Sequence, residues 1–164
     1  MPALPKTRDV LSVPEVYAKT TTGQQFLIYQ SASSDVVIFC TTTNLQLLCR
    51  AELVTMDGTF DAAPALYSQL FTLHVFEFGK LLPLVYCLLA SKDRASYVTV
   101  FSVLKTKAQE IQLTFAPQTI ISDFESGLIA AVRDELLNAH HQGCYFHFTQ
   151  VRLSQLINLV TLAK

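Results

Sequence analysis

The sequence has no tryptophan, only five glycines and few charged residues, which make up 15% of its 164 positions. Charged content well below the typical ~25% argues against a disordered chain and indicates that many strands are buried on both faces. Lysine and arginine together number 12 against 13 acids, so the overall charge does not attract nucleic acid, and DNA contact would need a local basic patch. The length fits one domain with a sizeable core.

Long apolar runs and clustered cysteines are missing as well. The longest apolar run, 81–90, holds ten residues including a proline, whereas a bilayer span needs about 20. The N-terminal residues, Met-Pro-Ala-Leu-Pro-Lys, lack the apolar segment of a signal peptide. Cys40, Cys49, Cys87 and Cys144 are dispersed in apolar runs, which is typical of free thiols in a reducing compartment. We therefore expect a soluble, intracellular protein without a membrane partner.

Hydrophobic periodicity predicts an α/β fold. Short apolar runs predict strands over 26–30, 35–39, 52–60, 69–77, 81–89, 119–121 and 143–148. Apolar residues at helical spacing predict helices over 42–50, 93–108, 124–138 and 149–163. The short Phe78-Gly79-Lys80 connection predicts an antiparallel hairpin. Three strands in an antiparallel meander, followed by alternating helices and strands, describe a mixed sheet.

Two aspartates stand at the carboxyl ends of predicted strands: Asp57 follows Leu-Val-Thr-Met, and Asp123 follows Thr-Ile-Ile-Ser. Each also has a simpler interpretation. Asp57-Gly58 is typical of a hairpin turn, and Ser122 with Glu125 is typical of a capping box at a helix start. If the two strands are neighbours, however, the carboxylates could converge on a metal pair. Oxygen ligands suit Mg²⁺, and two divalent ions can clamp the reacting oxygens of a phosphodiester.

Several short motifs follow one another across residues 36–160. They are Asp57-Gly58-Thr59-Phe60, Pro64, Tyr67-x-Gln69-Leu70-Phe71, Pro83-Leu84-Val85-Tyr86-x-Leu88-Leu89, Tyr97 with Phe101, Ile120-Ile121-Ser122-Asp123-Phe124-Glu125, and Gly143-Cys144-Tyr145-Phe146-His147-Phe148-x-Gln150. In order and spacing this series resembles the MULE (Mutator-like element) transposases, whose catalytic domain is RNase H-like. The resemblance implies an RNase H-like mixed sheet, C-terminally incomplete, in a domain over 36–164 that follows a lead-in over 1–35.

By that resemblance, Asp57 and Asp123 are the first two members of a DDE triad and ligands for Mg²⁺ or Mn²⁺. Such enzymes cut and join transposon-end DNA in the nucleus, and a homo-oligomer is compatible with that activity. The family's third acid is a Glu beyond the Cys/His block, but this sequence has no acid after Glu135. We therefore expect a fragment or a decayed derivative with little strand-transfer activity. The alternative is a catalytically inert module that binds DNA or protein.

Cys144, His147 and Gln150 belong to the family signature, and their function is left open. With His140 and His141 just upstream, the pair also suggests a zinc site, since zinc binds Cys and His at short spacing. If the predicted last strand forms, however, Cys144 and His147 point to opposite faces, and one Cys with one His falls short of four ligands. The zinc site is therefore the less favoured interpretation. A hydrogen-bonded His147 is likewise favoured over a phosphate contact.

The basic residues nearest the predicted helix over 93–108 offer a local patch. Lys92, Arg94, Lys105 and Lys107 could contact a DNA backbone, but a solvated helix face explains them as well and is favoured. His74 lies within an apolar strand, where we expect it to fill the core or the surface.

Overall fold

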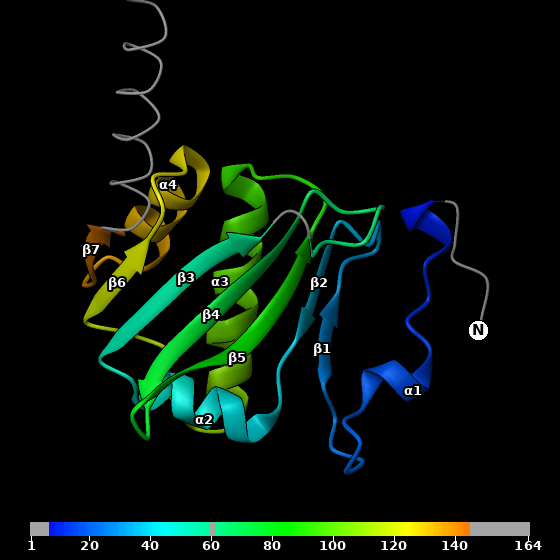
Figure 1. Ribbon diagram of the computed structural model, residues 1–164, viewed down its shortest axis with the longest axis horizontal. Helices are drawn as coiled ribbons and strands as arrows, with labels where there is room; N and C mark the ends of the chain where they lie inside the picture. Colours follow the sequence, from blue (N-terminus) through cyan, green and yellow to red (C-terminus); the bar gives the residue numbers. More distant parts are fainter. Residues whose placement is uncertain (1–6, 60–61, 145–164) are drawn as a thin grey trace, which may run out of the picture.

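The computed structural model describes residues 7–59 and 62–144, which form one mixed seven-stranded sheet with helices. The strands are β1 (Leu27–Gln30), β2 (Val36–Phe39), β3 (Leu53–Thr59), β4 (Gln69–Glu77), β5 (Lys80–Leu89), β6 (Thr119–Ser122) and β7 (His140–Gly143), in the spatial order β1-β2-β5-β4-β3-β6-β7. The helices are η1 (Arg8–Val10), α1 (Glu15–Ala18), α2 (Thr42–Arg50), α3 (Arg94–Glu110) and α4 (Ser126–Glu135). The α/β fold with a mixed sheet is therefore confirmed (Figure 1).

The predicted antiparallel meander is present in β3, β4 and β5. Phe78 and Gly79 form the turn between β4 and β5, both with positive φ (53° and 72°). Paired positive φ values match the right-handed twist of flanking strands, which is why short hairpins use them. At the far side of β5, β2 and then β1 extend the sheet with further antiparallel pairs.

The strands that follow α3 pair in parallel. The helices α3 and α4 carry the chain back, so that β6 and β7 each run in the same direction as β3. β6 pairs with β3, and β7 pairs with β6, both in parallel. The prediction of a strand over 143–148 is wrong at its start: β7 begins three residues earlier, at His140, and its last pair joins Ser122 to Gly143. The ladder ends there because β6 is only four residues long. Residues 145–148 and the predicted helix over 149–163 lie outside the described residues.

The core lies between the sheet and helices α2, α3 and α4. Alternate strand residues such as Val54, Met56 and Phe71 share one buried cluster with Leu104 of α3 and Val132 of α4. Because side chains alternate along a strand, the intervening residues point away from these helices. Figure 1 shows α3 crossing behind the sheet. We call this side the helix-covered face and the other the opposite face.

The helix starts are fixed by side-chain caps. The Asp93 carboxylate accepts the Ser96 N–H at 2.8 Å at the start of α3, and the Thr41 hydroxyl accepts the Asn44 N–H at 3.1 Å at the start of α2. Such caps satisfy amides that have no partner in the first helical turn. The helix predicted over 93–108 is confirmed as α3, and the one over 124–138 is shorter, as α4. The helices within 7–59 and 62–144 are too short or too polar to cross a membrane.

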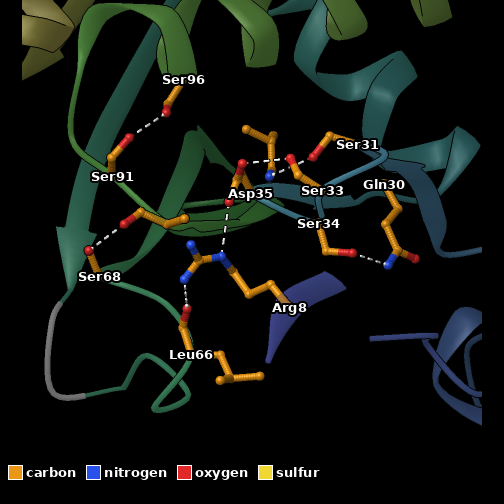
Figure 2. Close-up of polar contacts among 12 residues, drawn as sticks. Arg8, Gln30, Ser31, Ser33, Ser34, Asp35, Leu66, Ser68, Ser91 and Ser96 are labelled. Atoms are coloured by element: carbon orange, nitrogen blue, oxygen red, sulfur yellow. Dashed lines mark hydrogen bonds and ion pairs between the residues drawn. The ribbon is translucent and has the colours of Figure 1, made fainter. Parts of the chain in front are cut away.

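The segment before β1 is tied to the sheet through Arg8. Its Nε donates to Asp35 at 2.9 Å, and its Nη1 donates to the Leu66 carbonyl at 3.0 Å, in the connection between β3 and β4 (Figure 2). β1 itself pairs with β2, so the sheet begins before residue 36. The division of the chain into 1–35 and 36–164 stays a prediction.

Candidate functional site

Asp57 lies within β3 and not in a turn. It pairs with Thr72 inside the β3–β4 ladder, which continues to Thr59 opposite Leu70. The hairpin-turn interpretation is therefore wrong: the local Asp-Gly signal is overridden by pairing with β4. Val54 and Met56 are buried on the helix-covered face, so Asp57 lies on the opposite face, where it is half-buried.

Asp123 follows β6 directly, in the short turn that leads to α4. Its Oδ1 accepts the backbone N–H of Glu125 at 3.2 Å. The expected capping box is wrong, because Ser122 is the last residue of β6, and Glu125 itself occupies the N-cap position. The Ser122 hydroxyl instead donates to the Asp123 carbonyl at 2.9 Å and contacts His141 Nε2 at 2.8 Å.

The parallel ladder between β3 and β6 relates the two aspartates. Its pairs, from Leu53–Thr119 to Thr55–Ile121, each join a residue to the one 66 positions later. Asp57 and Asp123 are separated by the same 66 positions, two residues beyond the last printed pair, so a continued register would set them opposite each other. Residues that are partners in a ladder project to the same face. Asp57, near the end of β3, and Asp123, directly after β6, thus both lie toward the carboxyl ends of two adjacent parallel strands.

Each aspartate has a half-buried histidine nearby, which the sequence did not indicate. Burial lowers the pKa of His74 on β4 below its ordinary value, and the charge of Asp57 partly opposes that shift. Burial likewise lowers the pKa of His141 on β7, with Asp123 opposing it. Burial thus favours the uncharged form of both imidazoles beside the aspartates.

Buried Gln69 and Tyr97 and half-buried Glu125 form a row of hydrogen-bonded polar side chains next to Asp123. The hydroxyl of Tyr97, which is 1% exposed, donates to Glu125 Oε1 and accepts from Gln69 Nε2 at 2.5 Å. Burial, and next the Glu125 carboxylate, raise the pKa of Tyr97, while burial raises the pKa of Glu125 despite that hydrogen bond. Helical periodicity marked Tyr97 as a core residue, but its hydroxyl partners are 28 positions away along the sequence.

Gln69 is fully buried and lies against Gly58. Its Oε1 has no hydrogen-bond partner within the described residues, and a Cβ at Gly58 would come within 2.5 Å of that oxygen. Glycine at position 58 thus leaves room for the Gln69 amide beside the end of β3. Together, Gln69, Tyr97 and Glu125 join β4, α3 and the turn after β6.

The described residues provide two carboxylates at this edge but no group of three His, Cys, Asp or Glu side chains that could hold a metal. Cys144 follows β7, and its backbone N–H donates to the Ser122 carbonyl at 2.6 Å. His147 and Gln150 lie outside the described residues. The zinc interpretation and the signature roles of these side chains therefore stay predictions.

Most of the basic residues around α3 are engaged in ion pairs. Arg94 pairs with Asp134 at 2.7 Å, Lys105 with Glu135 at 2.9 Å, and Lys107 with Glu110 at 2.9 Å. The first two pairs join α3 to α4. This arrangement favours the solvated-face interpretation over a patch that attracts DNA phosphates.

A model of the MULE transposase domain matches residues 53–151, more than half of the chain. The chain belongs to the MULE transposase family. The matched region of this MULE domain includes β3 to β7, and thus both aspartates and the hydrogen-bonded residues Gln69, Tyr97 and Glu125. No curated protein matches the sequence at a significant level.

Proposed function

We propose that this MULE domain binds a divalent cation, Mg²⁺ or Mn²⁺, through Asp57 and Asp123 and acts on DNA phosphodiesters during transposition. The observation that carries the proposal is the register of β3 and β6, whose offset of 66 positions equals the separation of Asp57 and Asp123, in a domain of a transposase family. The strand order β5-β4-β3-β6-β7, an antiparallel meander continued by two parallel strands, supports an RNase H-like sheet.

The donor set suits Mg²⁺. This ion keeps several waters and binds proteins through one or two carboxylates together with substrate phosphates. Asp57 and Asp123 would supply those carboxylates, and the opposite face of the sheet leaves them half-buried rather than sealed in the core. When bound, divalent ions stabilise the charge that develops on the attacking and leaving oxygens of a phosphodiester.

Cleavage by this chain is proposed to be slow. The described residues hold no group of three His, Cys, Asp or Glu side chains that could bind a metal ion. Removing a ligand or its support from a metal-centred site costs orders of magnitude in rate. Family membership also supports transposon-end DNA as the partner, a nuclear location and self-association, which we include in the proposal.

Calorimetric titration of the purified chain with Mn²⁺ tests the metal site. We expect binding in the wild type, and its loss in Asp57→Asn and in Asp123→Asn, because an amide keeps the shape of the side chain but removes its charge. Asp9→Asn, an exposed aspartate before β1, is the matched control and should bind as the wild type does. The proposed metal site would be contradicted if the wild type did not bind Mn²⁺. It would also be contradicted if Mn²⁺ binding survived in both Asp57→Asn and Asp123→Asn.

Nicking of supercoiled plasmid DNA in Mn²⁺ tests the reaction. We expect weak activity that disappears with a chelator and in both aspartate variants. If the chain binds Mn²⁺ and DNA but nicks nothing, the proposed chemistry is wrong and the inert binding module is correct.

A further inference from the structure

On the helix-covered face, buried Gln69 and Tyr97 and half-buried Glu125 form a hydrogen-bonded row of polar side chains. Gln69 is the first residue of β4, Tyr97 lies near the start of α3, and Glu125 precedes α4. Gln69 Nε2 donates to the Tyr97 hydroxyl, which donates to Glu125 Oε1. Burying polar groups is costly unless they are hydrogen-bonded, and here one acceptor, Gln69 Oε1, is left without a partner among the described residues.

Packing does not account for the Tyr97 hydroxyl. The Tyr97 ring meets Phe71 edge-on, with centroids 5.0 Å apart, and a phenylalanine ring could make the same contact. The hydroxyl adds only the two hydrogen bonds. Helix capping does not account for the Glu125 carboxylate either, because it makes no capping hydrogen bond within the described part of α4. Its Oε1 points to Tyr97 instead.

This row of hydrogen bonds ends at Asp123. Glu125 donates its backbone N–H to Asp123 Oδ1 at 3.2 Å while its side chain is held by Tyr97. The turn over 123–125 is therefore fixed at two points: the Asp123 carboxylate is tied to the Glu125 backbone, and the Glu125 side chain is tied to α3. At the other end of this row of hydrogen bonds, Gln69 lies against Gly58, the residue that follows Asp57. The hydrogen-bonded side chains thus run from Gly58, next to Asp57, to the turn that carries Asp123.

We propose that Gln69, Tyr97 and Glu125 are positioning residues that hold the Asp123 carboxylate in register with Asp57. This inference rests on the proposed metal site and deepens it. Glu125 acts through its hydrogen bond and not as a third metal ligand. Outer-shell groups of this kind orient carboxylate ligands, and their loss typically lowers metal affinity by about 10–100-fold.

Three substitutions separate positioning from ligation in the full chain. Tyr97→Phe removes the donor, Glu125→Ala removes the acceptor, and Glu125→Gln keeps an acceptor oxygen while removing the charge. We expect Mn²⁺ affinity to fall about tenfold in the first two variants. In Glu125→Gln it should stay within about twofold of the wild type, as an acceptor is retained. Tyr17→Phe, which removes the hydroxyl of a tyrosine that is 55% exposed in α1, is the matched control.

Amide hydrogen exchange, measured by NMR on the metal-free protein, tests the same positioning without metal. The Glu125 N–H should exchange about tenfold faster in Tyr97→Phe and Glu125→Ala than in the wild type, and at the wild-type rate in Glu125→Gln and Tyr17→Phe. If the wild type binds no Mn²⁺ but this exchange pattern appears, the proposed metal function fails while the tie between Tyr97 and the turn stands.

Two results would overturn the inference. One is an unchanged Glu125 exchange rate and an unchanged Mn²⁺ affinity in Tyr97→Phe. The other is a loss of Mn²⁺ affinity in Glu125→Gln as large as in Glu125→Ala, because that result would make the Glu125 carboxylate a ligand. Circular dichroism of each variant checks that the fold is retained, and Tyr97→Phe, which keeps the ring, decides the matter if Glu125→Ala unfolds.

Discussion

The two faces of the sheet carry different kinds of residues. On the helix-covered face, alternate residues of the central strands are almost completely buried, as Val54 and Leu73 show with 0% exposure. On the opposite face, the same strands present half-buried Asp57 and His74, and at the hairpin end the exposed Phe76, at 65%. One sheet thus separates the residues that stabilise the fold from the residues proposed to bind metal. Substitutions on the two faces should therefore affect different measurements.

The largest loss of stability is expected on the helix-covered face. Leu104 of α3 is fully buried in the main cluster. Leu104→Ala should lower the free energy of unfolding by about 2–5 kcal/mol, because it removes buried methyl groups and leaves a cavity. Urea unfolding followed by circular dichroism measures this. Leu137→Ala, at a leucine that is 80% exposed, should change stability by less than about 0.5 kcal/mol. Equal losses in the two variants would contradict the assigned packing of α3.

Gly58→Ala should have the next largest effect. A Cβ there would come within 2.5 Å of Gln69 Oε1, whose amide is held by Tyr97, so the Gln69 side chain would have to move. We expect a loss of about 1–3 kcal/mol in the same unfolding measurement. In a Gln69→Ala background the obstacle is absent, so adding Gly58→Ala should cost much less. If the two changes are additive, Gly58 and Gln69 do not interact as described.

Residue patterns in the sequence predicted those parts of the fold whose paired elements lie close together along the chain. Alternation of apolar residues and the Phe78-Gly79 turn predicted the β4–β5 hairpin, and helical spacing predicted α3. The edge strand β7 was placed too late because its residues His140, His141 and Gln142 are polar, and its position depends on pairing with β6 rather than on hydrophobic pattern. An exposed edge tolerates such residues.

The candidate site was only partly predictable for a related reason. Asp57 and Asp123 were singled out as acids after apolar runs, but their relation depends on the β3–β6 register. The hydroxyl contacts of Tyr97 with Gln69 and Glu125 span 28 positions in each direction, which no periodicity encodes. The sequence indicated which residues could carry chemistry, whereas their partners follow from non-local contacts.

A smaller and pH-dependent effect is expected at the start of α3. Asp93→Ala should cost about 1 kcal/mol at neutral pH, because it removes the cap on the Ser96 N–H. Hydrogen bonds, first from Ser91, lower the pKa of Asp93, so its charged form is favoured in the folded state. The stabilisation is therefore complete above the unfolded pKa of about 4 and is lost as pH falls through the lower folded pKa. Unfolding measured between pH 7 and pH 3 should show the wild type and the variant converging at the acid end. A constant difference across this range would contradict the assigned carboxylate cap.

The smallest effect is expected on the opposite face. Phe76 is 65% exposed at the hairpin end of β4, across from Leu81 of β5, which is 53% exposed. Phe76→Thr keeps a residue with high strand propensity, and because little apolar surface is buried at this position, stability should stay within about 0.5 kcal/mol of the wild type. Urea unfolding at several protein concentrations measures this effect. A loss near 2 kcal/mol that does not depend on concentration would mean that Phe76 is covered within one chain, and the two faces would then differ less than described. A loss that grows with concentration would instead place this end of the sheet in contact between copies of the chain.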